Sequence, residues 1–158
     1  MLKDKTNAMR LLDQKKIDYA MIFYDSDDGR IDGVSVAKKI GREVNEVYKT
    51  LIAQGTSHNY YVFIIPAEAE LHLKKAAKAA GEKKMEMIAV KDILKVTGYV
   101  RGGCSPVGMK KQYSTFIDES ARLLETVIVS GGKIGAQMEL KVNDLVKVTD
   151  GRLADLLK

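Results

Sequence analysis

Few side chains in this sequence could act as a nucleophile, a general base or a soft metal ligand. The main candidates are His58, His72 and Cys104, which lie far apart in the chain and share no metal-ligand spacing. Zinc sites use closely spaced cysteine and histidine ligands, so the sequence predicts no metal site and no cofactor. A catalytic cysteine needs a base within hydrogen-bond reach, and neither histidine stands in a segment with a reason to approach Cys104. Covalent catalysis by Cys104 is therefore kept only as the alternative to be tested.

Two glycine-rich stretches could instead bind a ligand through the backbone. The first runs from Thr97 to Gly108, and the second is the heptapeptide Val-Ser-Gly-Gly-Lys-Ile-Gly at 129–135. Adjacent glycines allow close approach of a ligand and can direct N–H groups at a carbonyl or phosphate oxygen. The second stretch lacks the Gly-x4-Gly-Lys-Ser/Thr spacing of a phosphate loop, so no nucleotide hydrolysis is expected. With Lys49 at the start of a predicted strand, the stretches offer backbone donors, a hydroxyl and a cation, but no strong general base.

Three ordered motifs carry a resemblance to a known family. They are Val-Tyr-Lys-Thr-Leu at 47–51, the stretch 97–111 around Gly-Gly-Cys-Ser-Pro, and Val-Ser-Gly-Gly-Lys at 129–133. These motifs resemble those of the YbaK/EbsC family of aminoacyl-tRNA deacylases, and the resemblance extends from Lys5 to Leu156. It implies a single α+β domain, residues 1–158, related to the editing domain of bacterial prolyl-tRNA synthetases. It also implies hydrolysis of mischarged tRNA in trans, typically Cys-tRNA(Pro), for translation fidelity, with prolyl-tRNA synthetase as a possible transient partner.

The resemblance also implies roles for individual residues. Lys49 matches the family's functional lysine, and Gly102 and Gly103 match the glycine pair that lines the pocket, so these three are the catalytic candidates. The substrate-binding candidates implied in the same way are Tyr24, Thr50, Ser130, Gly131 and Gln137. Two positions depart from the family pattern: Ile134 stands where an arginine is common, and Gln137 where part of the family has an aspartate. Amino-acid preference is the property that these departures affect.

The chemistry of an aminoacyl ester suits this sparse set of groups. The ester is already activated and a bound cysteine brings its own thiol, so no protein nucleophile is required. We expect the N–H groups of Gly102 and Gly103 to stabilise the oxyanion and Lys49 to hold the terminal ribose or its phosphate. Attack by the substrate thiol and attack by a held water both stay open. Three alternative functions also stay open: deacylation of Ala-tRNA(Pro), deacylation of a broader set of small amino acids, and non-catalytic binding of tRNA or a synthetase.

The elements that must position these residues are intermixed helices and strands without strict alternation. This pattern predicts an α+β fold with a mixed, largely antiparallel central sheet flanked by helices. The predicted helices cover 7–16, 33–40, 68–80, 91–97, 142–149 and 152–157, and the predicted strands cover 18–24, 49–53, 60–65, 115–117, 126–130 and 137–140. The strand at 18–24 is apolar or aromatic along both faces, which predicts burial on both sides. Gly131-Gly132 is expected to form a turn.

Composition limits the remaining possibilities. The 158 residues suit one domain, and 46% hydrophobic with 30% charged residues is typical of soluble globular proteins. A single cysteine allows no internal disulfide, and the longest apolar stretch, 60–67, falls far short of the ~18 residues of a membrane helix. We therefore expect a cytoplasmic protein with no membrane contact and an undetermined oligomeric state. The net charge of +5 suits a partner with a phosphate backbone, and the lysines expected to contact the acceptor end of tRNA are Lys74, Lys78, Lys110 and Lys111.

Overall fold

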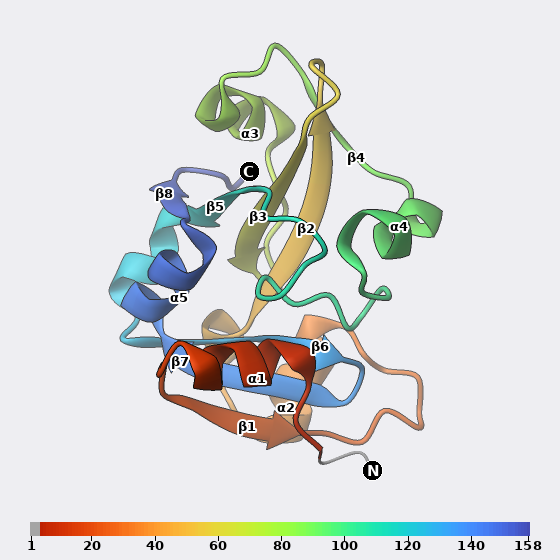
Figure 1. The fold of residues 1–158 in the computed structure, drawn as a ribbon, viewed down its shortest axis with the longest axis vertical. Coiled ribbons are helices and arrows are strands. Elements are labelled where there is room, and N and C mark those ends of the chain that lie inside the picture. Colours follow the sequence, from red (N-terminus) through yellow and green to blue (C-terminus); the bar gives the residue numbers. More distant parts are fainter. Residues whose placement is uncertain (1–3) are drawn as a thin grey trace.

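The computed structural model describes residues 4–158 and arranges their strands in two β-sheets (Figure 1). The first sheet has three antiparallel strands in the order β1-β7-β6, and the second has five strands in the order β4-β2-β3-β5-β8. In the larger sheet β2 is antiparallel to β3 and β4, whereas β5 is parallel to β3 and β8. The strands are β1 Tyr19–Phe23, β2 Tyr48–Gly55, β3 Tyr60–Pro66, β4 Met85–Met87, β5 Ser114–Asp118, β6 Thr126–Lys133, β7 Ala136–Lys141 and β8 Arg152–Ala154. The predicted α+β class with mixed strand directions is confirmed, and the strands are divided between two sheets.

Short helices surround the sheets, and their ends follow local capping rules. They are α1 Asn7–Gln14, α2 Gly33–Ile40, α3 Leu73–Ala80, α4 Ile93–Thr97 and α5 Val142–Thr149, with 3-10 turns at Val44–Glu46, Val90–Asp92 and Glu119–Leu123. Thr6 begins α1 by accepting a hydrogen bond from the Met9 N–H at 3.2 Å, as an N-cap residue should. Figure 1 shows α1 lying across the three-stranded sheet and α3 near the far end of the larger sheet. Within residues 4–158, no helix is long and apolar enough to cross a membrane.

The two sheets are joined into one packed core. A parallel bridge pairs Val47, just before β2, with Ile128 in β6. The largest cluster of buried apolar residues contains Met9 from α1, Ile64 from β3 and Met138 from β7, so it extends through both sheets. The motif residues of β2 and of the β6–β7 hairpin therefore meet at the junction of the sheets.

Two predictions in the N-terminal half of the chain are wrong: burial of both faces of the strand at 18–24, and the start of the helix at 68–80. Ala20 and Met21 of β1 are exposed, because β1 is an edge strand that pairs only with β7. The predicted helix at 68–80 begins only at Leu73, where the His72 Nδ1 accepts a hydrogen bond from the Lys75 N–H at 3.2 Å. The residue before it, Leu71, forms an isolated bridge with Leu157 instead of continuing the helix.

Two further predictions fail in the strands, and one strand was missed. Residues 152–157 form no helix, since Arg152–Ala154 become β8 and pair with β5. Gly131-Gly132 lies inside β6 at a β-bulge, and the turn falls at Ile134-Gly135. Strand β4, which pairs with β2 at residues 53–55, was not predicted.

Candidate functional site

A cavity of about 480 Å³, called here the first cavity, lies where the two sheets meet. Residues 47–52 of β2 and its approach line one side, and Ser130 and Gln137 line it from the smaller sheet. The first glycine-rich stretch, residues 97–108 and called here the glycine loop, contributes Arg101, Gly102 and Cys104. The other lining residues are Ile31, Asp32, Gly33, Ala67, Met87, Ile88, Val90 and Ile93. The structure thus brings all three sequence motifs to one cavity.

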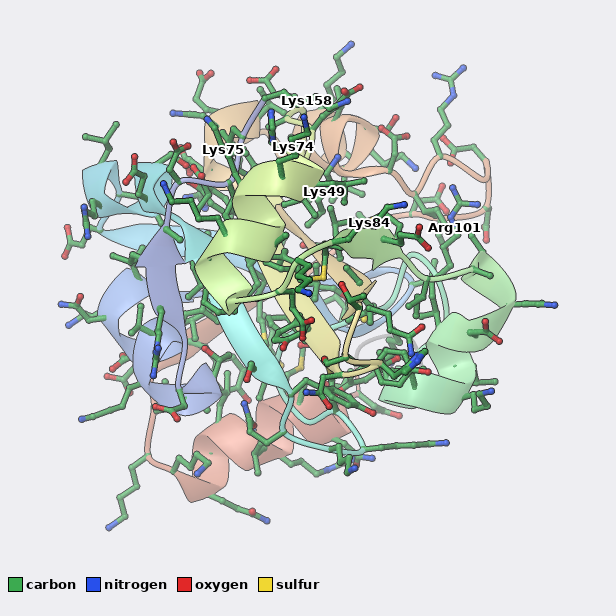
Figure 2. The ribbon with its side chains drawn as sticks, turned by 90° about the horizontal axis from the view of Figure 1, so that it is seen from above. Lys49, Lys74, Lys75, Lys84, Arg101 and Lys158 are labelled. Carbon is green, nitrogen blue, oxygen red and sulfur yellow. The ribbon has the colours of Figure 1, made fainter. Side chains whose placement is uncertain are left out.

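Lys49 supplies an uncompensated cation at this cavity. Within the described residues its ammonium forms no hydrogen bond and no ion pair. Burial lowers the pKa of Lys49, and the more distant Glu70 carboxylate only partly opposes this shift. Figure 2 labels Lys49 between Lys74 and Lys84, on the same face of the molecule in that view. A half-buried, unpaired ammonium of this kind is suited to bind an anionic or hydroxyl-rich ligand.

Two buried acceptors of the cavity also have no partner. Gln137 is 7% exposed, and its Oε1 makes no hydrogen bond with residues 4–158. The Oγ1 of Thr50 is likewise buried and unpaired. A buried polar group left unsatisfied costs roughly 1–3 kcal/mol, so native structures rarely keep one without a reason. A ligand that brings N–H or O–H donors into the first cavity removes this cost.

Ser130 and Gln137 hold their places through the pairing of β6 with β7. They are direct register partners across the two strands. The Ser130 Oγ accepts a hydrogen bond from the Gly132 N–H at 3.2 Å, which ties the hydroxyl to the β-bulge of the same strand. The cross-strand pair therefore presents a hydroxyl and an amide side by side to the cavity.

The adjacent glycines of the glycine loop, Gly102 and Gly103, have different positions. Gly102 lines the cavity with φ +84°, and a Cβ placed on it would lie 2.5 Å from the Ile31 Cδ1. The Gly103 N–H donates to the Val100 carbonyl at 3.0 Å, and this residue packs on the backbone of Lys133 and Ile134 outside the lining. In the part of the chain that the structure describes, the Gly102 N–H has no partner. Gly102 is therefore the member of the pair whose N–H remains available to a ligand.

Two predicted substrate-binding residues lie outside the lining. The Tyr24 N–H donates to Gly135 at 3.0 Å, and the Lys39 Nζ lies 5.7 Å from the centre of the Tyr24 ring. Gly131 is buried in β6, where an added Cβ would lie 2.8 Å from the Met9 Cε of α1. Both residues contact elements that support the cavity, and their roles in binding stay predictions.

Cys104 lines the cavity in an environment that opposes thiolate formation. Burial raises the pKa of its thiol to about 11, although a hydrogen bond with Thr97 partly counters the shift. A nucleophilic cysteine requires the opposite shift. His72 is occupied as the cap of α3, and His58 lines a different cavity. Among residues 4–158, no group of three His, Cys, Asp or Glu side chains could hold a metal ion.

Several lining residues were missed by sequence reasoning. Asp32 and Gly33 reach the cavity from the start of α2, and Met87 and Ile88 reach it from β4 and the residue after it. The Asp32 side chain accepts a hydrogen bond from the Ser35 N–H, an N-cap pattern that is visible in the sequence. Ile134, which departs from the family pattern, packs near Gly102, where its Cγ1 would lie 3.6 Å from an added Cβ.

Comparison with known proteins relates this chain to one family. Residues 32–148 match the model of the aminoacyl-tRNA editing domain. A protein of Enterococcus faecalis named "Putative Cys-tRNA(Pro)/Cys-tRNA(Cys) deacylase EbsC" is 42% identical over 154 residues, which cover 98% of this chain and 94% of that protein. A second relative, "Uncharacterized protein YwhH" of Bacillus subtilis, is 25% identical over 109 residues, 69% of each chain.

Solved structures share the fold at lower identity. One described as "Crystal structure of a putative trans-editing enzyme for prolyl tRNA synthetase" superposes with a TM-score of 0.80 at 23% identity, covering 89% of this chain and 87% of that one. The hypothetical protein APE2540 superposes with a TM-score of 0.86 at 21% identity, covering 94% of this chain and 97% of its own. These similarities establish the fold, and the chemistry rests on the motifs and the cavity.

Proposed function

The chain belongs to the aminoacyl-tRNA editing domain family, and from this membership we propose that it deacylates mischarged tRNA in trans, with Cys-tRNA(Pro) as substrate. The observation that supports this most directly is the set of unpaired polar groups in the first cavity. They are the ammonium of Lys49, the Oγ1 of Thr50 and the Oε1 of Gln137. The E. faecalis relative named as a Cys-tRNA deacylase supports the choice of amino acid.

The aminoacyl ester supplies the groups that the cavity lacks. In the proposed complex its α-ammonium donates to the Thr50 Oγ1 and the Gln137 Oε1, which satisfies both acceptors. The Lys49 ammonium contacts the terminal ribose or its phosphate. The Gly102 N–H is proposed to donate to the oxyanion, a contribution of roughly 3–4 kcal/mol for one oxyanion donor in a serine protease.

Deacylation then proceeds without a protein nucleophile. When a held water attacks the ester carbonyl, the bond from the carbonyl carbon to the ribose oxygen breaks and the free amino acid is released; when the substrate thiol attacks, the same bond breaks and a cyclic thioester of cysteine is released. In both routes the proton lost by the attacking water or thiol is taken up by the ribose oxygen. Positioning the ester against these groups converts an encounter in solution into a local one. The raised pKa of the Cys104 thiol agrees with its absence from this scheme.

The apolar walls of the cavity disfavour a charged amino-acid side chain. Ile31, Ile93 and Met87 give it an apolar lining, which disfavours charged side chains because they would lose hydration. The same walls accept alanine, so Ala-tRNA(Pro) is the second candidate substrate.

We further propose that the whole chain, residues 1–158, acts as one editing domain in the cytoplasm. Met9 and Leu12 of α1 lie outside the residues matched by the family model, yet both are fully buried in the main core. Prolyl-tRNA synthetase is the proposed transient partner, because residues 4–158 show no separate RNA-binding unit that could select one tRNA.

Contacts to the acceptor end are expected to be few and electrostatic. Lys74, Lys78, Lys110 and Lys111 are exposed, and Figure 2 shows Lys74 and Arg101 on the face that carries Lys49. Neutralising phosphates releases counterions, so affinity should fall steeply with salt. Tight binding of free tRNA(Pro) that does not change with salt concentration would contradict this proposal.

A deacylation panel tests the function directly. Purified protein is mixed with Cys-tRNA(Pro), Ala-tRNA(Pro) and Pro-tRNA(Pro), and release of the amino acid is followed with time. We expect rapid release from Cys-tRNA(Pro), little from Pro-tRNA(Pro), and a large loss of activity in Lys49→Ala but none in the exposed control Lys38→Ala. Binding of Cys-tRNA(Pro) with no acceleration of its hydrolysis would reject the enzyme in favour of a binding module.

A further inference from the structure

A second cavity of about 350 Å³ lies directly beside the first. The two cavities share Met87 and Ile88 as lining residues. Strand β2 extends along both, with residues 48–52 at the first cavity and residues 54 and 55 at the second. The second cavity has no part in the deacylation chemistry described above.

The spacing of the cavities matches the reach of a short single strand. From Ile52, which lines the first cavity, to Gln54, which lines the second, β2 advances about 7 Å at ~3.3 Å per residue. A stacked nucleic-acid strand advances ~3.4 Å per nucleotide and more when its bases are splayed. A substrate whose terminal nucleoside occupies the first cavity therefore brings the splayed nucleotide next to it to the second one.

The charges in the second cavity favour a base over a phosphate. Lys84 supplies one positive charge, whereas Glu86 and Asp92 supply two negative charges. Lys84 and Glu86 form an exposed ion pair at 3.3 Å, and Asp92 caps no backbone N–H of α4. Carboxylates at this site repel a phosphate but accept hydrogen bonds from an exocyclic amino group, as Asp and Glu do with the N4 amino group of cytosine.

Flat side chains stand beside these carboxylates. Tyr60 and His58 both line the second cavity. The Tyr60 ring is held by an edge contact with Tyr113, at 5.8 Å between ring centres and 78° between planes. Proteins that bind splayed single-stranded bases stack them on aromatic and imidazole rings. Met87 is 44% exposed at the shared wall, which adds apolar surface between the two cavities.

We propose that the second cavity binds the penultimate base of the acceptor end, a cytosine, while the aminoacylated terminal nucleoside occupies the first cavity. This inference rests on the proposed function for the identity of the substrate. Glu86 and Asp92 accept hydrogen bonds from the amino group of the base, and Tyr60 or His58 stacks on its face. The backbone phosphates are placed near the cations that line the two cavities, Lys49, Lys84 and Arg101, which Figure 2 shows along the same face.

Binding of short oligonucleotides tests the inference without requiring turnover. The probes are the labelled RNA tetranucleotides ACCA and ACUA, in which uracil replaces the amino group of the penultimate base with a carbonyl oxygen. We expect the wild-type protein to bind ACCA at least about fivefold more tightly than ACUA, the lower end for one good base contact. The double variant Glu86→Gln/Asp92→Asn should lose most of this preference. Glu43→Gln, an exposed carboxylate outside both cavities, is the matched control and should keep it.

Several results would overturn the inference. They are equal affinity of the wild-type protein for the two probes, binding of neither at millimolar concentration, or a preference that the double variant retains. Deacylation of Cys-tRNA(Pro) measured on the same preparations separates this failure from that of the proposed function. A base preference without deacylation rejects the function alone, and Lys49-dependent deacylation without a base preference rejects the second site alone.

Discussion

Replacing Gly102 with alanine tests whether close packing fixes the glycine loop at the first cavity. Gly102 has φ +84°, a conformation that costs an L-residue about 1–2 kcal/mol. The new Cβ would also lie 2.5 Å from the Ile31 Cδ1 and 3.3 Å from its Cγ1. Ile31 must therefore leave its rotamer, at a cost of about 0.5–1.5 kcal/mol. The free energy of unfolding should fall by about 2–3 kcal/mol.

Thermal unfolding and steady-state deacylation measure the two consequences. At about 2–4 °C per kcal/mol for a chain of this size, Gly102→Ala should lower the Tm by roughly 4–12 °C. Because Ile31 and Gly102 both line the first cavity, kcat/KM should fall by about tenfold or more, in line with the cost of displacing an oxyanion donor.

A matched control separates the backbone cost from the clash. Gly29 has φ +74°, and an added Cβ would meet no atom within 4 Å, so Gly29→Ala should pay only the backbone cost. The double variant Gly102→Ala/Ile31→Val removes the atom nearest the new methyl group. It should be more stable than the sum of its single variants by about 0.5 kcal/mol or more. Equal losses in Gly29→Ala and Gly102→Ala, together with an additive double variant, would refute the reasoning.

Three further predictions concern side chains that carry or could carry charge. Lys49→Ala, and less severely Lys49→Arg, should lower kcat/KM without lowering the Tm. Because burial lowers the pKa of Lys49, the ammonium should lose its proton at a pH below the ordinary lysine pKa. A pH–rate profile of the wild-type protein should therefore show activity falling in that alkaline range. Cys104→Ala and Cys104→Ser should keep most of the activity, since burial raises the pKa of this thiol to about 11. Loss of turnover in both folded variants, with an acyl group trapped on Cys104 in the parent protein, would instead establish covalent catalysis. The Arg42 guanidinium beside Glu139 lowers the pKa of that carboxyl to about 2, so its stabilisation is complete above the unfolded value of 4.5 and is lost as the pH falls through 2. Urea unfolding between pH 6 and pH 2 should therefore show Glu139→Gln to be less stable at pH 6, with the two curves converging at the acid end.

Local sequence signals predicted the elements that local interactions determine. Thr6 and Asp32 begin α1 and α2 through side-chain caps, and Gly41 and Gly81 end α2 and α3 in the left-handed conformation. Each of these features depends on residues within one helical turn, so a single sequence contains the needed information.

The failed predictions involve partners far away in the chain. Residues 152–154 become a strand because β5 offers an open edge about 35 residues earlier. Strand β4 forms against the outer edge of β2 for the same reason. Hydrophobic periodicity describes which faces are apolar, but it does not say which edge a segment will join.

The site shows the same division. The three motifs contain Lys49, Thr50, Gly102 and Ser130, and the family resemblance added Gln137; the structure places all five in the lining of the first cavity. Their roles in binding and catalysis stay predictions. The apolar walls from the loop before α2, from β4 and from α4 were missed, because Ile31, Met87 and Ile93 look like ordinary core residues until the sheets are assembled. Chemistry-bearing residues can be found by type and spacing, whereas the walls that select a substrate are a property of the tertiary fold.

The arrangement of the first cavity has a consequence for how the enzyme could lose activity. With no protein nucleophile in the proposed scheme, catalysis depends on holding an ester against fixed donors and acceptors, and a displacement of about 1 Å can cost about a hundredfold in rate. The donors come from the glycine loop and the acceptors from β2 and β7, which are separate parts of the chain joined by close packing at Gly102, Ile31 and Ile134. Substitutions at these packing contacts should therefore reduce kcat nearly as much as loss of Lys49, although none of the three supplies a charged or acid–base group. Such sensitivity distinguishes catalysis by positioning from catalysis by one reactive side chain.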